Sequence, residues 1–147
     1  MDKHITLEGQ ENDVTTAGLA RMNMILHNFP TANILPGNTL SSPKFKDGPQ
    51  LRTYDYVVAN PPFSDKSWST GLIPEKDDYQ RFSWGVPPRK QGDYAYLLHI
   101  VRSMKSTGKA ACILPHGVLS VSYTHLDVYK RQQPSRRTMQ HHCRKIS

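Results

Sequence analysis

One short segment carries side chains that could do chemistry from a fixed position. An apolar run, YDYVVAN (54–60), leads directly into Pro61, Pro62 and Phe63. Proline cannot donate to a strand ladder and forces the preceding residue into extended geometry, so we expect Asn60 at the tip of a strand. This places an amide oxygen, which accepts hydrogen bonds, close to a ring that can stack on a planar group. Strand tips are where α/β enzymes bind their ligands. The alternative is a plain strand-ending turn with a buried Phe.

Two polar residues follow other predicted strands. Glu11 ends the stretch HITLEGQE (4–11), and Asn38 follows Gly37 after a short strand around 34–35. An acidic residue at the end of the second strand of a nucleotide-binding unit commonly binds ribose hydroxyls. An Asn side chain can both accept and donate. Each residue also has a structural interpretation, because Glu11 can cap the next helix and Asn38 is typical of a turn.

The elements that must position these residues alternate between strands and helices. We expect strands over 4–11, around 34–35, over 54–60 and over 110–115. The strand over 54–60 is nearly all apolar, which is typical of a parallel strand covered on both faces. The segment 41–53 is predicted to be loop. This order favours the α/β class, with a mainly parallel, doubly wound sheet.

Two helices are predicted from apolar residues at helical spacing. The first spans 12–28 and can be capped by Asn12, Asp13 or Thr15. The second spans 92–109, with Gly108 as its expected end. The apolar faces consist of Val14, Leu19, Met22 and Leu26 in the first helix, and of Tyr94, Leu97, Leu98, Val101 and Met104 in the second.

The segment 61–91 is predicted to be long and irregular, since it holds five of the 11 prolines. Long loops inside compact domains are usually functional or disordered. Its aromatic and basic side chains suit either a nucleic-acid-facing surface or an ordinary solvated loop; they are Trp68, Trp84, Lys66, Arg81, Arg89 and Lys90. His99 is interpreted as a helix-face residue and His116 as a loop residue, not as metal ligands.

Charge is distributed unevenly along the 147 residues, whose net charge is +7. Residues 1–120 hold 13 Lys and Arg against 11 Asp and Glu, whereas 121–147 hold six against one. The chain has no apolar run long enough to span a membrane and no secretory signal pattern. Its two cysteines form no disulfide framework. These features predict a cytoplasmic protein.

The C-terminal tail has its own interpretation. The segment VSYTHLDVYKRQ (121–132) resembles the translation of a transposon end used as a sequencing adapter, joined to its inverted copy. On that interpretation 121–147 is a foreign or artefactual tail, and we expect it to be disordered. The alternative is an ordinary strand and loop, which its Val, Tyr and Thr content permits. The HHC at 141–143 offers adjacent ligands without a second pair at zinc spacing, so no metal site is expected.

Several segments together carry a family resemblance. GQENDVTTAGLARMNMILHN (9–28), GNTL (37–40) and VVANPPF (57–63) occur in the order expected of DNA adenine-N6 methyltransferases, and 92–119 resembles the stretch that follows them. Over 5–119 the chain resembles the methylation subunit of type I restriction–modification systems. The resemblance implies a partial Rossmann-like methyltransferase domain over 1–120, dependent on S-adenosylmethionine and truncated at both ends.

The resemblance also implies roles for the residues at the strand tips. Asn60, Pro61, Pro62 and Phe63 would form the catalytic segment. The Asn60 side-chain oxygen and the Pro61 carbonyl would accept the two N–H groups of an adenine amino group, which localises the lone pair on its nitrogen. Phe63 would stack on the base after it leaves the duplex. Glu11 would bind the ribose of S-adenosylmethionine, and Asn38 would lie near the adenine ring of that cofactor.

The same resemblance implies partners and sets the alternatives. Double-stranded DNA, a specificity subunit and a restriction subunit would be partners, and no membrane is implied. The family's Gly-rich cofactor loop would precede the strand at 4–8, so we expect the chain alone neither to methylate DNA nor to bind the cofactor tightly. The alternatives are a stand-alone methyltransferase acting on N6 of adenine, on RNA or on a protein glutamine, and a non-catalytic nucleic-acid-binding module.

Overall fold

The computed structural model describes residues 5–115 and residue 118. The chain divides into two units, residues 1–114 and 115–147, and the elements below all lie in the first. His116 and the segment 121–147, including the HHC at 141–143, lie outside the described residues. Among the described helices, none is long and apolar enough to cross a membrane.

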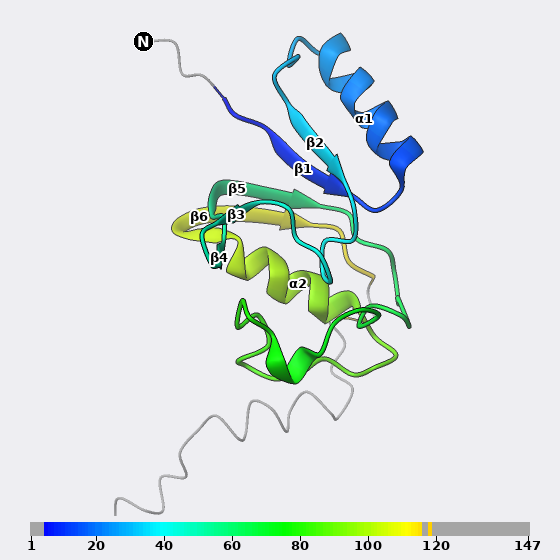
Figure 1. The fold of residues 1–147 in the computed structure, drawn as a ribbon, viewed down its shortest axis with the longest axis vertical. Helices are drawn as coiled ribbons and strands as arrows, with labels where there is room; N and C mark the ends of the chain where they lie inside the picture. Colours follow the sequence, from blue (N-terminus) through cyan, green and yellow to red (C-terminus); the bar gives the residue numbers. More distant parts are fainter. Residues whose placement is uncertain (1–4, 116–117, 119–147) are drawn as a thin grey trace, which may run out of the picture. The chain divides into compact units, whose positions relative to one another are not determined.

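The first half of the described part is a strand–helix–strand unit. Strands β1 (Glu8–Glu11) and β2 (Asn33–Pro36) pair in parallel, and helix α1 (Val14–Leu26) connects them. Asp13 caps the helix, because its side chain accepts from the Thr16 N–H at 2.7 Å. Figure 1 shows α1 alongside this strand pair, which it contacts through both strands. The predicted parallel connection is confirmed.

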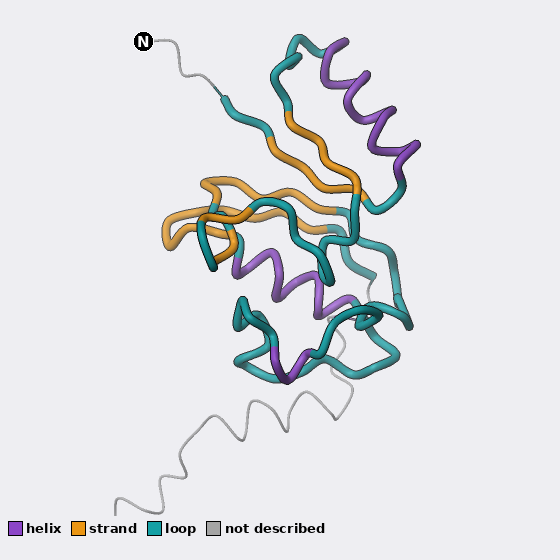
Figure 2. Tube along the Cα trace, viewed as in Figure 1, coloured by secondary structure: helices purple, strands orange, loops and turns teal. Residues whose placement is uncertain are grey.

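The second half repeats the parallel arrangement. Strand β5 (Tyr54–Ala59) pairs in parallel with β6 (Met104–Cys112). Between them the chain forms a long, mostly irregular segment with one 3-10 turn, η1 (Pro74–Lys76), and then helix α2 (Asp93–Arg102), which contacts β6. Figure 2 shows how much of this segment is loop. The α/β class with parallel strands is therefore confirmed.

The boundary between α2 and β6 differs from the prediction. The helix ends at Arg102 and not at 109, and β6 starts at Met104 and not at 110. The Ser103 N–H donates back to the carbonyls of His99 and Ile100, while its own carbonyl accepts from the Tyr54 N–H at 2.9 Å. Met104 and the residues from Lys109 to Cys112 pair with β5, and the polar stretch 105–108 between them lies at a shift in register. Gly108 lies inside that strand and does not end the helix.

The segment 41–53 is not wholly loop. Strands β3 (Lys46–Asp47) and β4 (Gln50–Leu51) form a short antiparallel hairpin. Gly48 in its turn has φ 63°, a left-handed conformation that glycine adopts without the penalty of a Cβ. Asp47 pairs with Gln50, so Gly48 and Pro49 form a two-residue turn, and a glycine at the first position of such a turn favours a hairpin.

The predicted burial of β5 is wrong for the described residues, and the apolar spacing in α1 does not correspond to burial either. Val14, Leu19, Met22 and Leu26 of α1 are exposed, and Ala17 is the buried residue of that helix. A pair of strands covers only a narrow stripe of a helix, so the rest of the apolar face stays open. In β5, Tyr56 and Val58 are exposed, so the strand is not covered on both faces.

The buried core joins the long irregular segment, α2 and the turn after β2. It consists of Leu40, Trp68, Phe82 and Ala95, with Leu72, Tyr96 and Leu98 packed against it. The rings of Trp68 and Phe82 lie 5.5 Å apart in a tilted arrangement. Trp68 was predicted to suit a solvated or DNA-facing loop, and that prediction is wrong because its side chain is buried. Trp84 and the basic residues Lys66, Arg89 and Lys90 are exposed.

A buried ion pair within this irregular segment also contacts α2, through His99. The Arg81 guanidinium and the Asp77 carboxylate are both fully or almost fully buried and approach to 2.6 Å. Arg81 also contacts His99 Nδ1 at 3.2 Å, and its guanidinium lies over the rings of Tyr79 and Phe82. Arg81 is thus a buried residue that connects the irregular segment with α2, contrary to the predicted surface position.

His99 makes the stability of the chain depend on pH. Burial, together with the neighbouring Arg81 guanidinium, lowers the pKa of His99 from 6.5 to about 4, although the Asp77 carboxylate opposes this. Between these two pKa values the unfolded chain binds a proton that the folded chain does not, so the free energy of unfolding falls as the pH falls. We expect a loss of about 2 kcal/mol between pH 7 and pH 4.5, since one pKa unit corresponds to about 1.4 kcal/mol.

Urea unfolding at these two pH values tests this expectation. The His99→Gln variant should lose most of the pH dependence, whereas His27→Gln, at an exposed position, should keep it. Burial raises the pKa of Asp77, but its hydrogen bonds with Arg81 outweigh that effect and lower it below 3.8, so this carboxylate contributes only in more acidic solution. An unchanged pH dependence in His99→Gln would contradict the assignment.

The two halves are joined by polar contacts at the starts of β1 and β5. The Glu8 carboxylate accepts from Arg52 Nη1 and from the Tyr54 hydroxyl, both at 2.6 Å. Burial and the Glu8 hydrogen bond raise the pKa of Tyr54, so its hydroxyl stays a donor at neutral pH. Gln10 of β1 also contacts the loop after β2, because its side chain donates to the Ser42 carbonyl and accepts from the Lys44 N–H.

Candidate functional site

Asn60 lies where the sequence predicts it, directly after the carboxyl end of β5. The last strand residue, Ala59, is paired with Cys112, and its carbonyl accepts from the Ile113 N–H at 3.1 Å. Asn60 is exposed, and its side chain makes no hydrogen bond to another described residue. Pro61 behind it is buried. The amide group is therefore presented to solvent from a backbone that is fixed on both sides.

Phe63 is presented in a similar way. Its side chain is 56% exposed, and it is one of several large apolar side chains on the surface. An exposed ring near an exposed amide, three residues apart at a strand end, can stack on a planar group while the amide accepts from it. The alternative of a strand-ending turn with a buried Phe is wrong, because the ring is open to solvent.

The residues proposed for cofactor binding lie at the carboxyl ends of β1 and β2. Glu11 ends β1 opposite Pro36, and the next residue, Gly37, donates its N–H to the Glu11 carbonyl at 2.8 Å. Gly37 has φ 138°, and a Cβ there would lie 3.1 Å from Lys44 Cε. A glycine therefore lets the chain turn tightly at this point, with Asn38 following directly.

The side chains of Glu11 and Asn38 are partly engaged. Glu11 Oε1 accepts from the Asp13 N–H at 3.0 Å, at the start of α1. Asn38 Oδ1 accepts from the N–H groups of Leu40 and Ser41, at 2.8 and 3.0 Å. Because a carbonyl oxygen has two lone pairs, Asn38 keeps mainly its side-chain N–H₂ group for a ligand. The turn interpretation of Asn38 therefore fits, whereas the helix is capped by Asp13 and Glu11 only accepts from the N–H of that cap residue. Among the described residues, the second Glu11 carboxylate oxygen and the Asn38 N–H₂ group make no hydrogen bond.

The structure brings some of the predicted residues together and leaves others apart. Glu11, Gly37 and Asn38 are neighbours at adjacent strand ends. Within residues 5–115, no hydrogen bond or ion pair links these to Asn60 or Phe63. What the two groups share is their place after parallel strands, the position where α/β domains bind their ligands.

Sequence reasoning did not single out Asp93, the first residue of α2. Its carboxylate is buried and accepts from the Ser64 N–H at 3.0 Å, immediately after Phe63. An acidic residue directly after a glycine at a helix start signals a helix beginning. The partner 29 residues earlier carries no local signal, so only the structure shows the contact.

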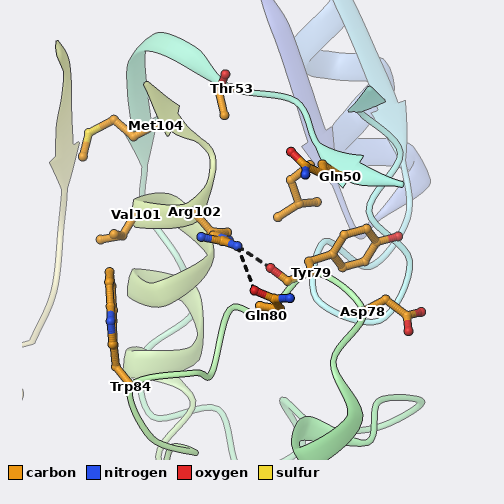
Figure 3. A pocket seen from close by; sticks show the side chains of 10 residues that line it. Gln50, Thr53, Asp78, Tyr79, Gln80, Trp84, Val101, Arg102 and Met104 are labelled. Atoms are coloured by element: carbon orange, nitrogen blue, oxygen red, sulfur yellow. Dashed lines mark hydrogen bonds between the residues drawn. The ribbon is translucent and has the colours of Figure 1, made fainter. Parts of the chain in front are cut away.

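A cavity of about 310 Å³ lies at the opposite ends of the strands. Figure 3 shows side chains of α2, β4 and the 78–84 segment around it, together with Thr53 before β5 and Met104 at the start of β6. Arg102 is held there by the Tyr79 carbonyl at 3.0 Å and by Gln80 Oε1 at 3.4 Å. Because Asn60 follows the other end of β5, this cavity is separate from the candidate site.

In the described part of the chain, no three His, Cys, Asp or Glu side chains gather as metal ligands.

Comparison with known proteins places the chain in a family. The family model described as N-6 DNA Methylase matches residues 1–131, which includes most of the segment 121–132. The chain is 31% identical over 131 residues to the type I restriction enzyme MjaIX methylase subunit of Methanocaldococcus jannaschii, covering 86% of this chain and 22% of that relative. It is 30% identical over 121 residues to the HindI methylase subunit of Haemophilus influenzae, covering 80% of this chain and 25% of that relative.

A solved structure agrees with these sequence matches. The crystal structure of the type I restriction-modification system methyltransferase subunit from Streptococcus thermophilus superposes with a TM-score of 0.68 at 28% identity, covering 88% of this chain and 33% of that one. The chain thus spans about a fifth to a third of the length of the proteins it matches. With the strand-tip Asn60 and its following prolines, the match over residues 1–131 shows that the chain belongs to the N-6 DNA methylase family.

Proposed function

We propose that this chain is the catalytic segment of a DNA adenine-N6 methyltransferase that acts as the methylation subunit of a type I restriction–modification complex. The observation that carries the proposal is the exposed amide of Asn60 at the end of a parallel strand, with an exposed ring three residues later, in a member of this family. The whole subunit's activity, cofactor and partners follow from this proposal.

The proposed chemistry uses two acceptors against the two N–H groups of an adenine amino group. The nitrogen of that group is a poor nucleophile, because its lone pair is delocalised into the ring. The Asn60 side-chain oxygen and the Pro61 carbonyl each accept a hydrogen bond from one of the two N–H groups. These hydrogen bonds orient the amino group so that the lone pair localises on its nitrogen. These acceptors are preorganised, since β5 fixes the backbone before Asn60 and the two prolines restrict it afterwards.

Phe63 provides a stacking surface for the target base. A base inside a duplex cannot present its amino group to Asn60, so it must leave the stack. The exposed ring of Phe63 can then lie against the face of the extruded base, at a gain of about 1–3 kcal/mol for such stacking. The partner of the subunit is therefore double-stranded DNA, with a separate specificity subunit to select the sequence and a restriction subunit to complete the complex.

S-adenosylmethionine is the methyl donor in this proposal and supplies an activated methyl group when it is bound. The polar groups at the ends of β1 and β2 fit two of its parts. Glu11 has one carboxylate oxygen unbonded within the described residues and can accept from ribose hydroxyls. Asn38 has its N–H₂ group to donate to a ring nitrogen, whereas its oxygen already accepts from Leu40 and Ser41.

The test uses a methylase subunit as long as those of the relatives, in which this chain takes the place of the segment that it matches. We call this protein the full-length subunit. It is incubated with its specificity subunit, plasmid DNA and S-adenosylmethionine carrying a labelled methyl group. We expect label on N6 of adenine, identified by mass spectrometry of the hydrolysed nucleosides. A folded, DNA-binding full-length subunit that labels RNA or a glutamine side chain but not adenine would overturn the proposal.

A further inference from the structure

The segment that follows the Asn60–Phe63 segment turns sharply at Ser64. The φ angle of Ser64 is 53°, a left-handed conformation that residues with a Cβ seldom adopt. The turn lies directly after the exposed ring of Phe63. A residue in this conformation needs surrounding contacts to hold it, because serine has no intrinsic preference for it. The contacts that hold Ser64 therefore also decide where Phe63 points.

The buried carboxylate of Asp93 provides such a contact. Asp93 is 3% exposed, and its Oδ1 accepts from the Ser64 N–H at 3.0 Å. It is the first residue of α2, where the partial positive charge of the helix start stabilises a carboxylate. The left-handed turn is thus held by an anchored acceptor.

Two further hydrogen bonds connect the start of α2 with the residue after Ser64. The Gly92 N–H donates to the Asp65 carbonyl at 2.9 Å, and the Tyr96 hydroxyl donates to Asp65 Oδ2 at 3.2 Å. A Cβ on Gly92 would lie 2.7 Å from Trp68 Cβ and 2.9 Å from the Asp65 carbonyl oxygen. The chain therefore lies directly against the first turn of α2, at a distance that only glycine permits.

Resting on the proposed function, we propose that Asp93 is a positioning residue for the Asn60–Phe63 segment, which it holds through the Ser64 N–H. Helix α2 contacts β6, and β6 pairs with β5, the strand that leads into Asn60. The segment is thus held from β5 at its start and from α2 at its end, both parts of one packed unit. Asp93 acts through the backbone and touches neither base nor cofactor.

Amide hydrogen exchange on this chain tests the contact independently of catalysis. In Asp93→Ala we expect the Ser64 amide to exchange at least tenfold faster, while the amides of Val57 and Ala111 in the β5–β6 pair keep their rates. Asp93→Asn, which keeps an acceptor oxygen, should restore most of the Ser64 protection. The control is Glu75→Ala, at an exposed acidic side chain of η1, which should change neither rate. If Asp93→Ala does not fold, Asp93→Glu, with its carboxylate displaced by one methylene, gives the same comparison.

Kinetics of the full-length subunit test the consequence for the reaction. Asp93→Ala should lower kcat for adenine methylation at least tenfold with a much smaller change in KM for DNA, and Asp93→Asn should recover most of the rate. Unchanged Ser64 exchange, or faster exchange spread equally over the Val57 and Ala111 amides, would overturn the proposal, as would an unchanged kcat. If the unsubstituted full-length subunit does not methylate adenine, the proposed function fails while the exchange result still judges the contact.

Discussion

Replacing Asn60 by alanine in the full-length subunit is expected to lower kcat for adenine methylation by about a hundredfold to a thousandfold, the usual effect of removing one preorganised polar group from a transition state. The exposed side chain of Asn60 makes no hydrogen bond within the described residues, so its loss leaves the fold intact. The KM for DNA should change little, because one amide contributes a small part of the contact with a duplex. Single-turnover transfer of a labelled methyl group measures the chemical step directly.

Two further variants make this expectation specific to Asn60. Asn60→Asp keeps an acceptor oxygen in nearly the same place and should retain more activity than Asn60→Ala. Asn23→Ala removes the same side chain from an exposed position on α1 and should leave kcat unchanged. Full activity in Asn60→Ala, with normal DNA binding, would remove Asn60 from the reaction and favour a non-catalytic role for the strand tip.

The position of Asn60 could be predicted because its signal is local. Two prolines end a strand wherever they occur, and the strand before them is apolar over several residues. The same holds for the start of α1, where Asp13 is a typical capping residue and does cap the helix. The turn at Gly37 and Asn38 is local too, and the turn interpretation of Asn38 correctly anticipated that its oxygen bonds the backbone of Leu40 and Ser41.

What could not be predicted depends on partners distant in sequence. The stretch 104–108 has no strong propensity, and it lies in β6 where helix was expected, between Met104 and Lys109, which both pair with the distant strand β5. The sequence around Trp68 is typical of an exposed aromatic residue, but its side chain packs against Phe82 in the core. Asp93 is an ordinary first-turn acid until Ser64 is found beside it. Periodicity revealed the apolar face of α1 without revealing what covers it, and most of that face is exposed among the described residues.

The Arg81–Asp77 pair is the buried contact whose disruption should cost the chain most stability. Both side chains are fully or almost fully buried, and the guanidinium makes three contacts of 3.1 Å or less with the carboxylate. In Arg81→Met the Asp77 carboxylate would remain buried without its counter-charge, and we expect a loss of about 3–5 kcal/mol in the free energy of unfolding. Urea unfolding of this chain at pH 7 measures the change.

Most of that loss reflects the Asp77 carboxylate, which is left buried without its counter-charge. A second substitution separates this effect from the loss of packing. Asp77 Oδ2 also accepts from the Arg81 backbone N–H at 2.7 Å, so the test replaces it by asparagine, which keeps an acceptor oxygen and removes the charge. Asp77→Asn combined with Arg81→Met should therefore be clearly more stable than Arg81→Met alone, which makes the two substitutions strongly non-additive. Arg89→Met, at an exposed position, should change stability by less than about 0.5 kcal/mol. Additive losses in the double variant would mean that Arg81 stabilises the irregular segment through its contacts with Tyr79 and Phe82, and not by neutralising Asp77.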